Sequence, residues 1–158
     1  MGFHHVAVRV GDIDRATRFY VEALDGRVRT SPFVHEGPFA ETVMGGTPGA
    51  RFRVCHIDLP AGTVELFEFL EPKNATGGVA PPVAAQLHFA LEVPDVDAAL
   101  ARVEAAGGKR YWPEVVDIGG GGHAVYVTDP DGNIIELIDL SPDALIEVLL
   151  EREPAASQ

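Results

Sequence analysis

The sequence has one cysteine, few basic residues and no long apolar run. Because Cys55 has no second cysteine to pair with, the chain forms no internal disulfide, which is typical of a reducing compartment. Within "RFRVCHIDL" this residue is interpreted as a small apolar filler of a strand rather than as a nucleophile.

Lys and Arg number 12 against 24 Asp and Glu, a formal net charge of −12. A nucleic-acid or anionic-membrane partner is therefore not expected, since either requires a basic patch.

No apolar run approaches the ~20 residues that span a bilayer. Met1 is followed at once by strand-like sequence, not by a basic and then apolar leader. We therefore expect a cytoplasmic protein. A hydrophobic content of 46% over 158 residues is enough for one folded domain, or for two small halves that share a core.

The chain contains an internal repeat. "HHVAVRVGDIDRA" and "LHFALEVPDVDAA" match at a shift of 83 residues (88 − 5), which places His5 on His88. "VELFEF" and "IELIDL" match at a shift of 71 (136 − 65), which places Glu65 on Glu136. A fixed offset over several residues indicates a duplicated unit. The first copy carries about a dozen extra residues by this count, which we assign to a loop within residues 30–50.

Each copy predicts a strand, a helix and three further strands. The opening segments alternate and are rich in β-branched residues, and each is followed by an aspartate that suits a helix start and by apolar residues at helical spacing. The helices are expected to end near Gly26 and Gly107. Turns at "LPAG" and "DPDG" close the last strands. The predicted class is α+β, with one domain over residues 1–140 made of modules 3–72 and 86–140, then a C-terminal helix and a frayed tail over 141–158.

Strand alternation places the paired histidines on the face of each strand that points away from the helix. His5, Ala7 and Arg9 share one face of their strand, and the valines between them share the other. The apolar face must pack on the helix of its own module, so His5 and His88 lie on the opposite face. Phe33 and Glu92, with Arg9, are the substrate-binding candidates.

Two glutamates fall within apolar strands. A carboxylate buried in "TVELFEF" or "NIIELIDL" without a partner is costly, and a divalent cation removes that cost. His5, Glu65, His88 and Glu136 form a mixed N/O set that suits Zn, Ni, Co, Mn or Fe. Each residue alone fits a simpler interpretation, as a hydrogen-bonded strand histidine or a solvated glutamate. The recurrence of both types in both copies favours the metal site.

Several residues keep alternative interpretations. Glu68 competes with Glu65 for the same role, although alignment with Glu136 favours Glu65. His35, His56 and His123 have no repeat partner and are interpreted as loop, strand or rim residues. Arg51 is a second basic candidate beside Arg9. The run of glycines over 119–122 is interpreted as a flexible rim, because no helix follows it to make a phosphate loop.

The strings "HHVAVRVGDIDRATRFY", "VELFEF", "LHFALEVPDVDAALARVEAAGG" and "VYVTDPDGNIIELID" resemble the vicinal oxygen chelate superfamily. That superfamily includes glyoxalase I, methylmalonyl-CoA epimerase, extradiol dioxygenases and the bleomycin- and fosfomycin-resistance proteins. The resemblance covers roughly Phe3 to Asp139. It implies two tandem βαβββ modules that form an open, cup-shaped mixed sheet with helices outside, one divalent metal ion, and a homodimer. By residue matching, the family ligands fall on the same four residues.

The resemblance to glyoxalase I and the epimerase favours a metal-dependent lyase or isomerase. Such an enzyme abstracts a proton beside a carbonyl and stabilises an enediolate, with Glu136 and Glu65 as ligands and candidate bases. The substrate is expected to be a small molecule with vicinal oxygens. Two alternatives remain open: an Fe(II) extradiol-type dioxygenase, and a drug-binding resistance protein of the same fold.

Overall fold

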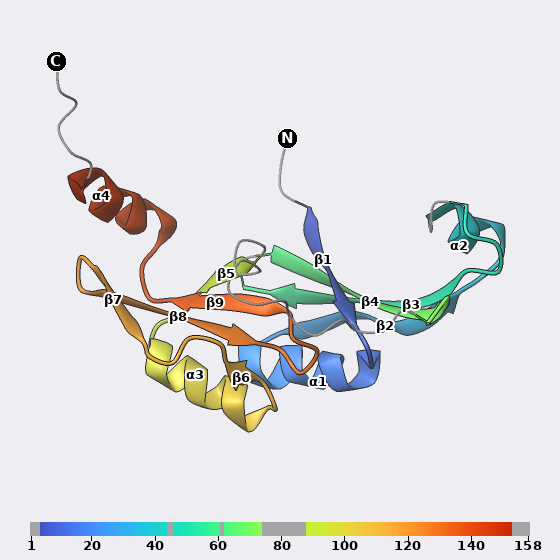
Figure 1. Cartoon of the computed structure of the whole chain (residues 1–158), viewed down its shortest axis with the longest axis horizontal. Helices are drawn as coiled ribbons and strands as arrows, with labels where there is room; N and C mark the ends of the chain where they lie inside the picture. Colours follow the sequence, from blue (N-terminus) through green and yellow to red (C-terminus); the bar gives the residue numbers. More distant parts are fainter. Residues whose placement is uncertain (1–3, 44–45, 61, 74–87, 153–158) are drawn as a thin grey trace, which may run out of the picture.

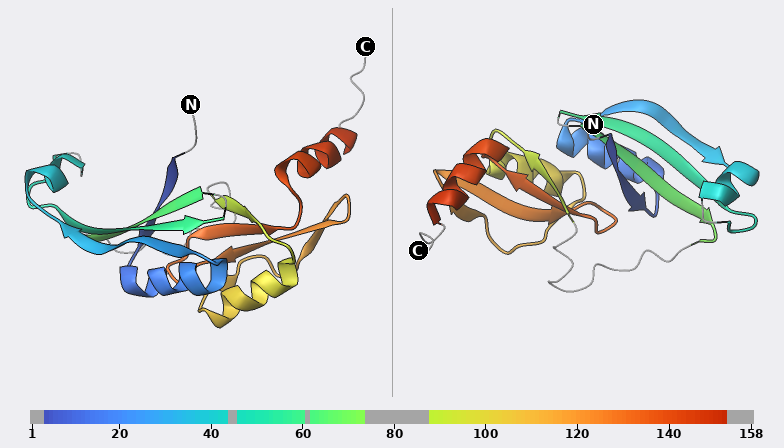
Figure 2. Two further views of the ribbon diagram at one scale, coloured as in Figure 1. Left: turned by 180° about the vertical axis from the view of Figure 1, so that it is seen from behind. Right: turned by 90° about the horizontal axis from the view of Figure 1, so that it is seen from above.

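Two βαβββ modules lie side by side, each with its helix beneath its sheet (Figures 1 and 2). This computed structural model describes residues 4–43, 46–60, 62–73 and 88–152. The first module contains β1 (His5–Val10), α1 (Ile13–Leu24), β2 (Arg27–His35), α2 (Pro38–Val43), β3 (Arg51–Leu59) and β4 (Gly62–Glu71). The second contains β5 (Phe89–Glu92), α3 (Val96–Ala105), β6 (Lys109–Arg110), β7 (Val116–Gly119), β8 (Gly122–Thr128) and β9 (Ile134–Ile138), and α4 (Pro142–Arg152) follows it.

The two sheets have matching topology. The strand orders are β1-β4-β3-β2 and β5-β9-β8-β6, with β7 also paired to β8. In each sheet the first strand is parallel to the last, and the neighbouring pairs are antiparallel. Ala7 lies opposite Glu65, and Ala90 lies opposite Glu136. The predicted α+β class and the duplicated arrangement are thus confirmed, because both sequence matches fall on the same register position.

The first helix of each module begins at the predicted aspartate. Asp12 accepts hydrogen bonds from the backbone N–H groups of Asp14 and Arg15, and Asp95 accepts one from Ala98. The end of α1 differs from the prediction. Asp25, rather than Gly26, takes the left-handed conformation with φ 55°, and the N–H of Gly26 then bonds the carbonyl of Tyr20 at 3.1 Å. Asp is among the residues that tolerate this conformation.

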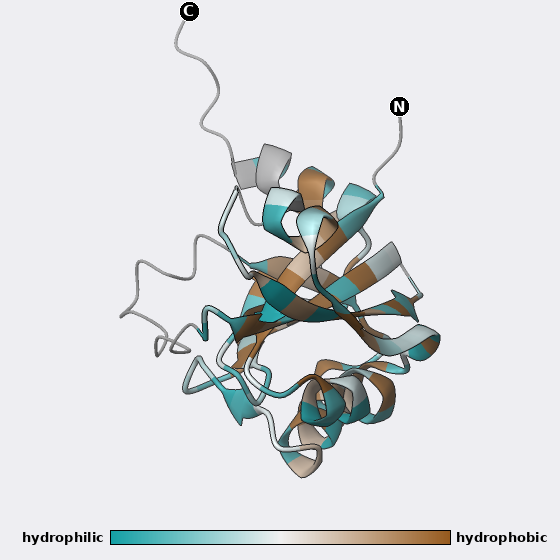
Figure 3. Cartoon of the chain, turned by 90° about the vertical axis from the view of Figure 1, so that its right-hand side faces the viewer, coloured by the Kyte–Doolittle hydropathy of each residue, from teal (hydrophilic) through white to brown (hydrophobic). Residues whose placement is uncertain are grey.

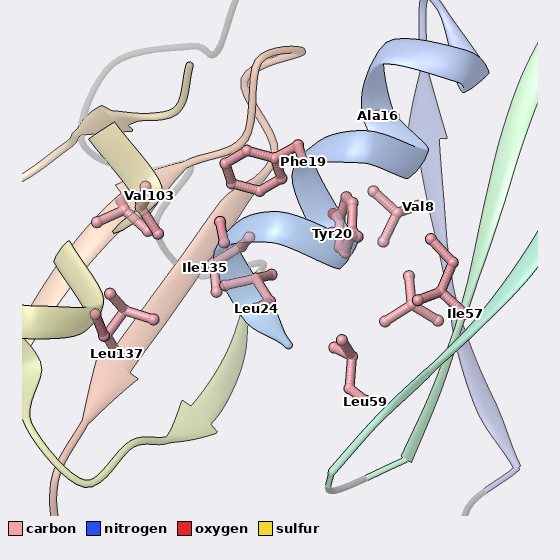
Figure 4. Close-up of a cluster of buried hydrophobic side chains, with 14 of the residues drawn as sticks. Val8, Ala16, Phe19, Tyr20, Leu24, Ile57, Leu59, Val103, Ile135 and Leu137 are labelled. Carbon is pink, nitrogen blue, oxygen red and sulfur yellow. The ribbon is translucent and has the colours of Figure 1, made fainter. Parts of the chain in front are cut away.

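One apolar core joins the modules. Figure 4 shows α1 between the two sheets, with Ile57 on one side of it and Ile135 on the other. Phe19 and Tyr20 of α1 are buried there, and α3 packs against α1. Strands alternate between hydrophobic and hydrophilic residues along their length (Figure 3). Their apolar faces therefore pack on the helices, as the alternation predicts, and their other faces lie away from the helices.

The turn between β8 and β9 fastens the second module to the end of β1. The Oδ1 atom of Asp131 accepts hydrogen bonds from the backbone N–H of Gly11 and from Arg15. The side chain of Asn133 donates to the carbonyl of Arg9 at 3.0 Å. The sequence "DPDGN" was expected only to reverse the chain. It also supplies polar contacts between the modules.

Three predicted features differ in the structure. Residues 30–50 are not a continuous loop, since β2 continues to His35 and α2 follows. The second strand of the second module, which follows the helix, is divided into β6 and β7, which both pair with β8. Gly120 and Gly122 within the run 119–122 are closely packed: a Cβ at Gly122 would lie 2.3 Å from Leu140, and one at Gly120 would lie 2.6 Å from Val148. Glycine is needed there for the close approach of the C-terminal segment. A Cβ at Gly121, by contrast, would have nothing within 4 Å.

The C-terminal helix begins as expected, because the N–H of Ala144 donates to the hydroxyl of Ser141 at 3.3 Å. Cys55 is buried in β3, and burial raises the pKa of its thiol, which is consistent with a filler role.

The predicted first residue of the second module, 86, and the tail 153–158 lie outside the described residues. Within the described chain, no helix combines the length and apolar character required to cross a membrane.

Candidate metal-binding site

The first module brings His5 and Glu65 together. Strand β1 lies beside β4, and the Nε2 atom of His5, at the start of β1, lies 3.5 Å from an oxygen of Glu65. The side chains are 34% and 17% exposed, so the pair is partly shielded yet reachable from solvent. Ala7, opposite Glu65, is exposed and has only a methyl group, which leaves space beside the carboxylate.

The second module repeats this pair. The Nε2 atom of His88 lies 3.2 Å from an oxygen of Glu136, and the side chains are 25% and 19% exposed. Ala90 occupies the place that Ala7 has in the first module. The same donors, one imidazole nitrogen and one carboxylate, therefore stand at the same register position of both sheets.

Glu65 rather than Glu68 faces the histidine. Glu68 points to the helix side of the sheet, where its carboxylate pairs with Arg53 at 3.1 Å. Arg53 also contacts Asp14 of α1, and the hydrogen bond that Arg53 donates to the Asp14 carboxylate is the main reason that the pKa of Arg53 is raised. Because these contacts occupy Glu68 on the opposite face, the alternative weighed for that residue is not supported.

Two residues that the sequence did not single out stand beside the glutamates. His56 on β3 lies opposite Glu65, and its Nε2 atom is 3.3 Å from the second carboxylate oxygen. Tyr126 on β8 lies opposite Glu136, and its hydroxyl is 3.2 Å from Nε2 of His88. Burial, and then the charge of Glu136, raises the pKa of Tyr126, so its hydroxyl stays protonated at neutral pH. The ring of Trp112 packs edge-on against Tyr126.

A shift in the repeat explains why these two residues were missed. His56 precedes Glu65 by nine positions (65 − 56), whereas Tyr126 precedes Glu136 by ten (136 − 126). The turn between the last two strands is longer in the second module, so a comparison at one fixed offset aligns His56 with Val127. Cross-strand register was the signal required, and it is available only once the strands are paired.

The donor chemistry of the two pairs fits a divalent ion. Neutral imidazole nitrogens and carboxylate oxygens bind Zn and other first-row metals, and both pairs direct Nε2 and a carboxylate oxygen toward each other. Among the residues that the structure describes, no three His, Cys, Asp or Glu side chains form a group that holds an ion. The convergence of all four candidates on one ion stays a prediction.

The substrate-binding candidates lie at different places. Arg9 is on the face of His5, and its guanidinium lies 5.8 Å from the ring centre of Phe69. It lines a pocket of about 200 Å³ at the ends of β1 and β4, together with Glu71 and Lys73. Phe33 is 48% exposed at the far side of the same sheet, beside His35. Glu92 is exposed at the end of β5.

His35, His123 and Arg51 make structural contacts. The ring of His35 packs against Phe52 of β3. His123 pairs with Asp139 at 3.3 Å. Arg51 pairs with Glu36 at 3.2 Å on the exposed surface. None of these contacts lies at the two glutamates.

Comparison with known proteins identifies relatives of the whole arrangement. The sequence profile of the Glyoxalase/Bleomycin resistance protein/Dioxygenase superfamily matches residues 2–137. A putative lactoylglutathione lyase from Brassica oleracea var. gemmifera is 31% identical over 94% of this chain and 48% of its own length. The chain thus spans about half the length of the plant relatives that it matches. A 2-epi-5-epi-valiolone epimerase from an Actinomyces species is 30% identical over 91% of this chain and 82% of its own length.

Solved structures share the fold. A glyoxalase family protein from Bacillus cereus has a TM-score of 0.74 at 24% identity, covering 86% of this chain and 91% of its own. The fosfomycin resistance protein FosX from Listeria monocytogenes has a TM-score of 0.64 at 16% identity, covering 92% and 98%. At these identities the likeness concerns the fold alone.

Proposed function

The chain belongs to the Glyoxalase/Bleomycin resistance protein/Dioxygenase superfamily, and from this premise we propose that it is a divalent-metal-dependent lyase or isomerase. Its substrate would be a small molecule with adjacent oxygens, from which the enzyme removes a proton next to a carbonyl. The single cysteine, buried and unpaired, supports a reducing compartment such as the cytoplasm.

The observation that carries this proposal is the duplicated pair. His5 with Glu65, and His88 with Glu136, stand at the same register position of two sheets, each beside an alanine. A histidine and a glutamate in contact are common on protein surfaces. The recurrence of both, partly shielded and with space beside them, supports an ion-binding role over two unrelated surface pairs.

His5, Glu65, His88 and Glu136 would hold the ion, as one of Zn, Ni, Co, Mn or Fe. When bound, a divalent ion acts as a Lewis acid on a carbonyl oxygen and so favours the loss of the neighbouring proton. The chain's own part is to orient the substrate and to move that proton. A carboxylate is a suitable base at this position, and Glu136 and Glu65 are the candidates. Tyr126, which keeps its proton, is placed to donate a hydrogen bond beside Glu136.

Two reaction types remain, and both have support among relatives. The lactoylglutathione lyases favour a lyase that acts on the adduct of a 2-oxoaldehyde and a thiol. The epimerase relative is matched over most of its length, which favours proton removal and return on the same carbon. Both reactions begin with the same proton transfer, so one site serves either.

We further propose that the two pairs act in a homodimer. Helices α1 and α3 pack against each other, and both pairs lie on the opposite faces of the sheets. A two-fold axis would bring the first-module face of one copy to the second-module face of the other, which makes two equivalent sites. Exposed Phe33, Val34 and Phe39 at the edge of the first sheet support a covered surface there.

Metal analysis followed by assays tests the function. The purified protein is expected to retain a divalent ion near one per chain and to lose activity in a chelator, with recovery on metal addition. Turnover of methylglyoxal plus a thiol would indicate the lyase, and racemisation of methylmalonyl-CoA would indicate the epimerase type. Oxygen-dependent catechol cleavage, or tight drug binding that needs no metal and gives no product, would overturn the proposal in favour of the dioxygenase or the resistance protein.

Mixed dimers test the shared site. His5→Ala and His88→Ala are each expected to abolish activity. When the two variants are unfolded together and refolded as an equal mixture, half of the dimers are mixed, and each has one intact site of two. About one quarter of wild-type activity should then return. If no activity returns while refolded wild type is active, the two pairs do not combine between chains.

A further inference from the structure

Four residues form a row across the first sheet. Thr30 on β2 pairs with His56 on β3, His56 pairs with Glu65 on β4, and Glu65 pairs with Ala7 on β1. The side chains of cross-strand partners lie on the same face of the sheet. Thr30, His56 and Glu65 are linked by contacts of 3.1 Å and 3.3 Å. The row ends beside His5, whose Nε2 atom faces the other oxygen of Glu65.

The contacts of His56 fix which of its ring nitrogens donates. The hydroxyl of Thr30 accepts a hydrogen bond from the backbone N–H of His56 at 3.0 Å and lies 3.1 Å from its Nδ1 atom. A hydroxyl has a single proton to donate, and it can donate it to a neutral Nδ1. The Nε2 atom, which faces the carboxylate, must carry a proton, since a lone pair directed at a carboxylate oxygen would be repulsive. His56 therefore donates to Oε1 of Glu65 through Nε2.

The hydrogen bond from His56 makes the two carboxylate oxygens of Glu65 inequivalent. Oε1 is held by His56, and Oε2 faces His5 at 3.5 Å. A carboxylate held in this way has one oxygen to offer to an ion and little freedom to rotate. Glu136 has no imidazole at the equivalent position. It has Tyr126, whose single hydroxyl proton is shared between His88 and Glu136.

We propose that His56 is a positioning residue that holds Glu65 as a fixed, single-oxygen ligand. This inference rests on the proposed metal-dependent function. It distinguishes Glu65 from Glu136, which the sequence repeat presents as equal. It also predicts that His56 acts on metal affinity through Glu65, without touching the ion.

The test measures Co²⁺ affinity by competition with a chelator, together with the visible absorption spectrum of the Co²⁺ protein. His56→Ala should weaken Co²⁺ binding by about 10- to 100-fold and alter the spectrum, as is typical when a hydrogen-bond partner of a metal ligand is removed. His56→Gln, whose side-chain amide can donate to Oε1, should restore most of the affinity. His123→Gln is the matched control, because His123 also pairs with a carboxylate but lies outside the site.

Nitrogen chemical shifts of the metal-free protein give a second, independent readout. Long-range ¹H–¹⁵N NMR of His56 should show the proton on Nε2. A wild-type His56 with its proton on Nδ1 and none on Nε2, or unchanged Co²⁺ affinity in a folded His56→Ala protein, would overturn the positioning role alone. A wild-type protein that binds no divalent ion would instead overturn the proposed function.

Discussion

The hydroxyl of Tyr20 donates a hydrogen bond to the carboxylate of Asp129 across the boundary between the two modules, over 3.2 Å. Both side chains are buried. The carboxylate also accepts from the backbone N–H groups of Asp131 and Asn133, and from the side chain of Asn133. Desolvation raises the pKa of the Asp129 carboxyl. Burial, and then the charge of Asp129, raises the pKa of Tyr20 well above its usual range. A polar link therefore stands inside the apolar core that joins the modules.

Tyr20→Phe removes only the donor of this link. The buried oxygen of Asp129 then loses one of its partners, so the free energy of unfolding should fall by about 1–3 kcal/mol. Urea unfolding at fixed protein concentration measures the change. Tyr111→Phe, in a partly buried tyrosine outside this link, should shift the free energy by less than about 0.5 kcal/mol. Equal effects of the two substitutions would contradict the role given to the hydroxyl.

The fold was largely accessible from the sequence because its signals are local and occur twice. Each copy repeats an alternating strand, a capping aspartate and a helix, and the register of Ala7 with Glu65 recurs as Ala90 with Glu136. Residues 30–50 were misread because Gly and Pro there suggested a loop. The strand β2 continues through Pro32 because it lies at the sheet edge, where a missing N–H need not be paired.

The N-cap of α1 gives a pH-dependent contribution to stability. Asp12 accepts from the N–H groups of Asp14 and Arg15, and the bond from Arg15 is the main reason that its pKa is lowered below 3.8. A depressed folded-state pKa means that the stabilisation is complete above pH 3.8 and is lost as the pH falls through the folded-state value.

Asp12→Ala should therefore lower the free energy of unfolding by about 1 kcal/mol at pH 7. The difference from wild type should shrink below pH 3.8. Asp12→Asn keeps an oxygen acceptor but has no charge to lose, so it should lower stability less and flatten the pH dependence. Unfolding midpoints collected from pH 3 to 7 for the three proteins measure this. A cap effect that is constant over the range would be evidence against the charge contribution.

Gly108 is required by its surroundings rather than by its backbone angle. A Cβ there would lie 2.6 Å from Val103, 2.7 Å from the carbonyl of Thr128 and 2.8 Å from Phe19. Gly108→Ala should destabilise the protein by about 1–3 kcal/mol, because the neighbours are core atoms and backbone. Gly121→Ala is the control: its φ is +79° and nothing lies within 4 Å, so only the backbone cost of about 1 kcal/mol applies. Thermal unfolding of the pair should rank Gly108→Ala as the less stable.

The candidate site was only half accessible from the sequence. The repeat singled out His5 and Glu65, which the structure brings into contact. It gave no reason to choose His56 or Tyr126, because neither lies at the fixed offset of the repeat. Their importance comes from cross-strand pairing with the glutamates, which depends on turn lengths that composition does not determine.

Glu136→Gln separates ligand binding from proton transfer. The amide keeps an oxygen that can contact an ion, but it cannot accept the substrate proton, so kcat should fall by at least about 10²-fold while most of the metal remains bound. Glu65→Gln changes the residue that His56 holds, so its main effect should be on metal affinity. The measurement pairs steady-state kinetics with metal content after dialysis, for both variants at the same protein concentration. Full activity in Glu136→Gln, or a kinetic loss confined to Glu65→Gln with metal retained, would assign the proton transfer to the other glutamate. The two residues occupy the same register position in their sheets, so a clear difference between the variants must come from the groups beside them.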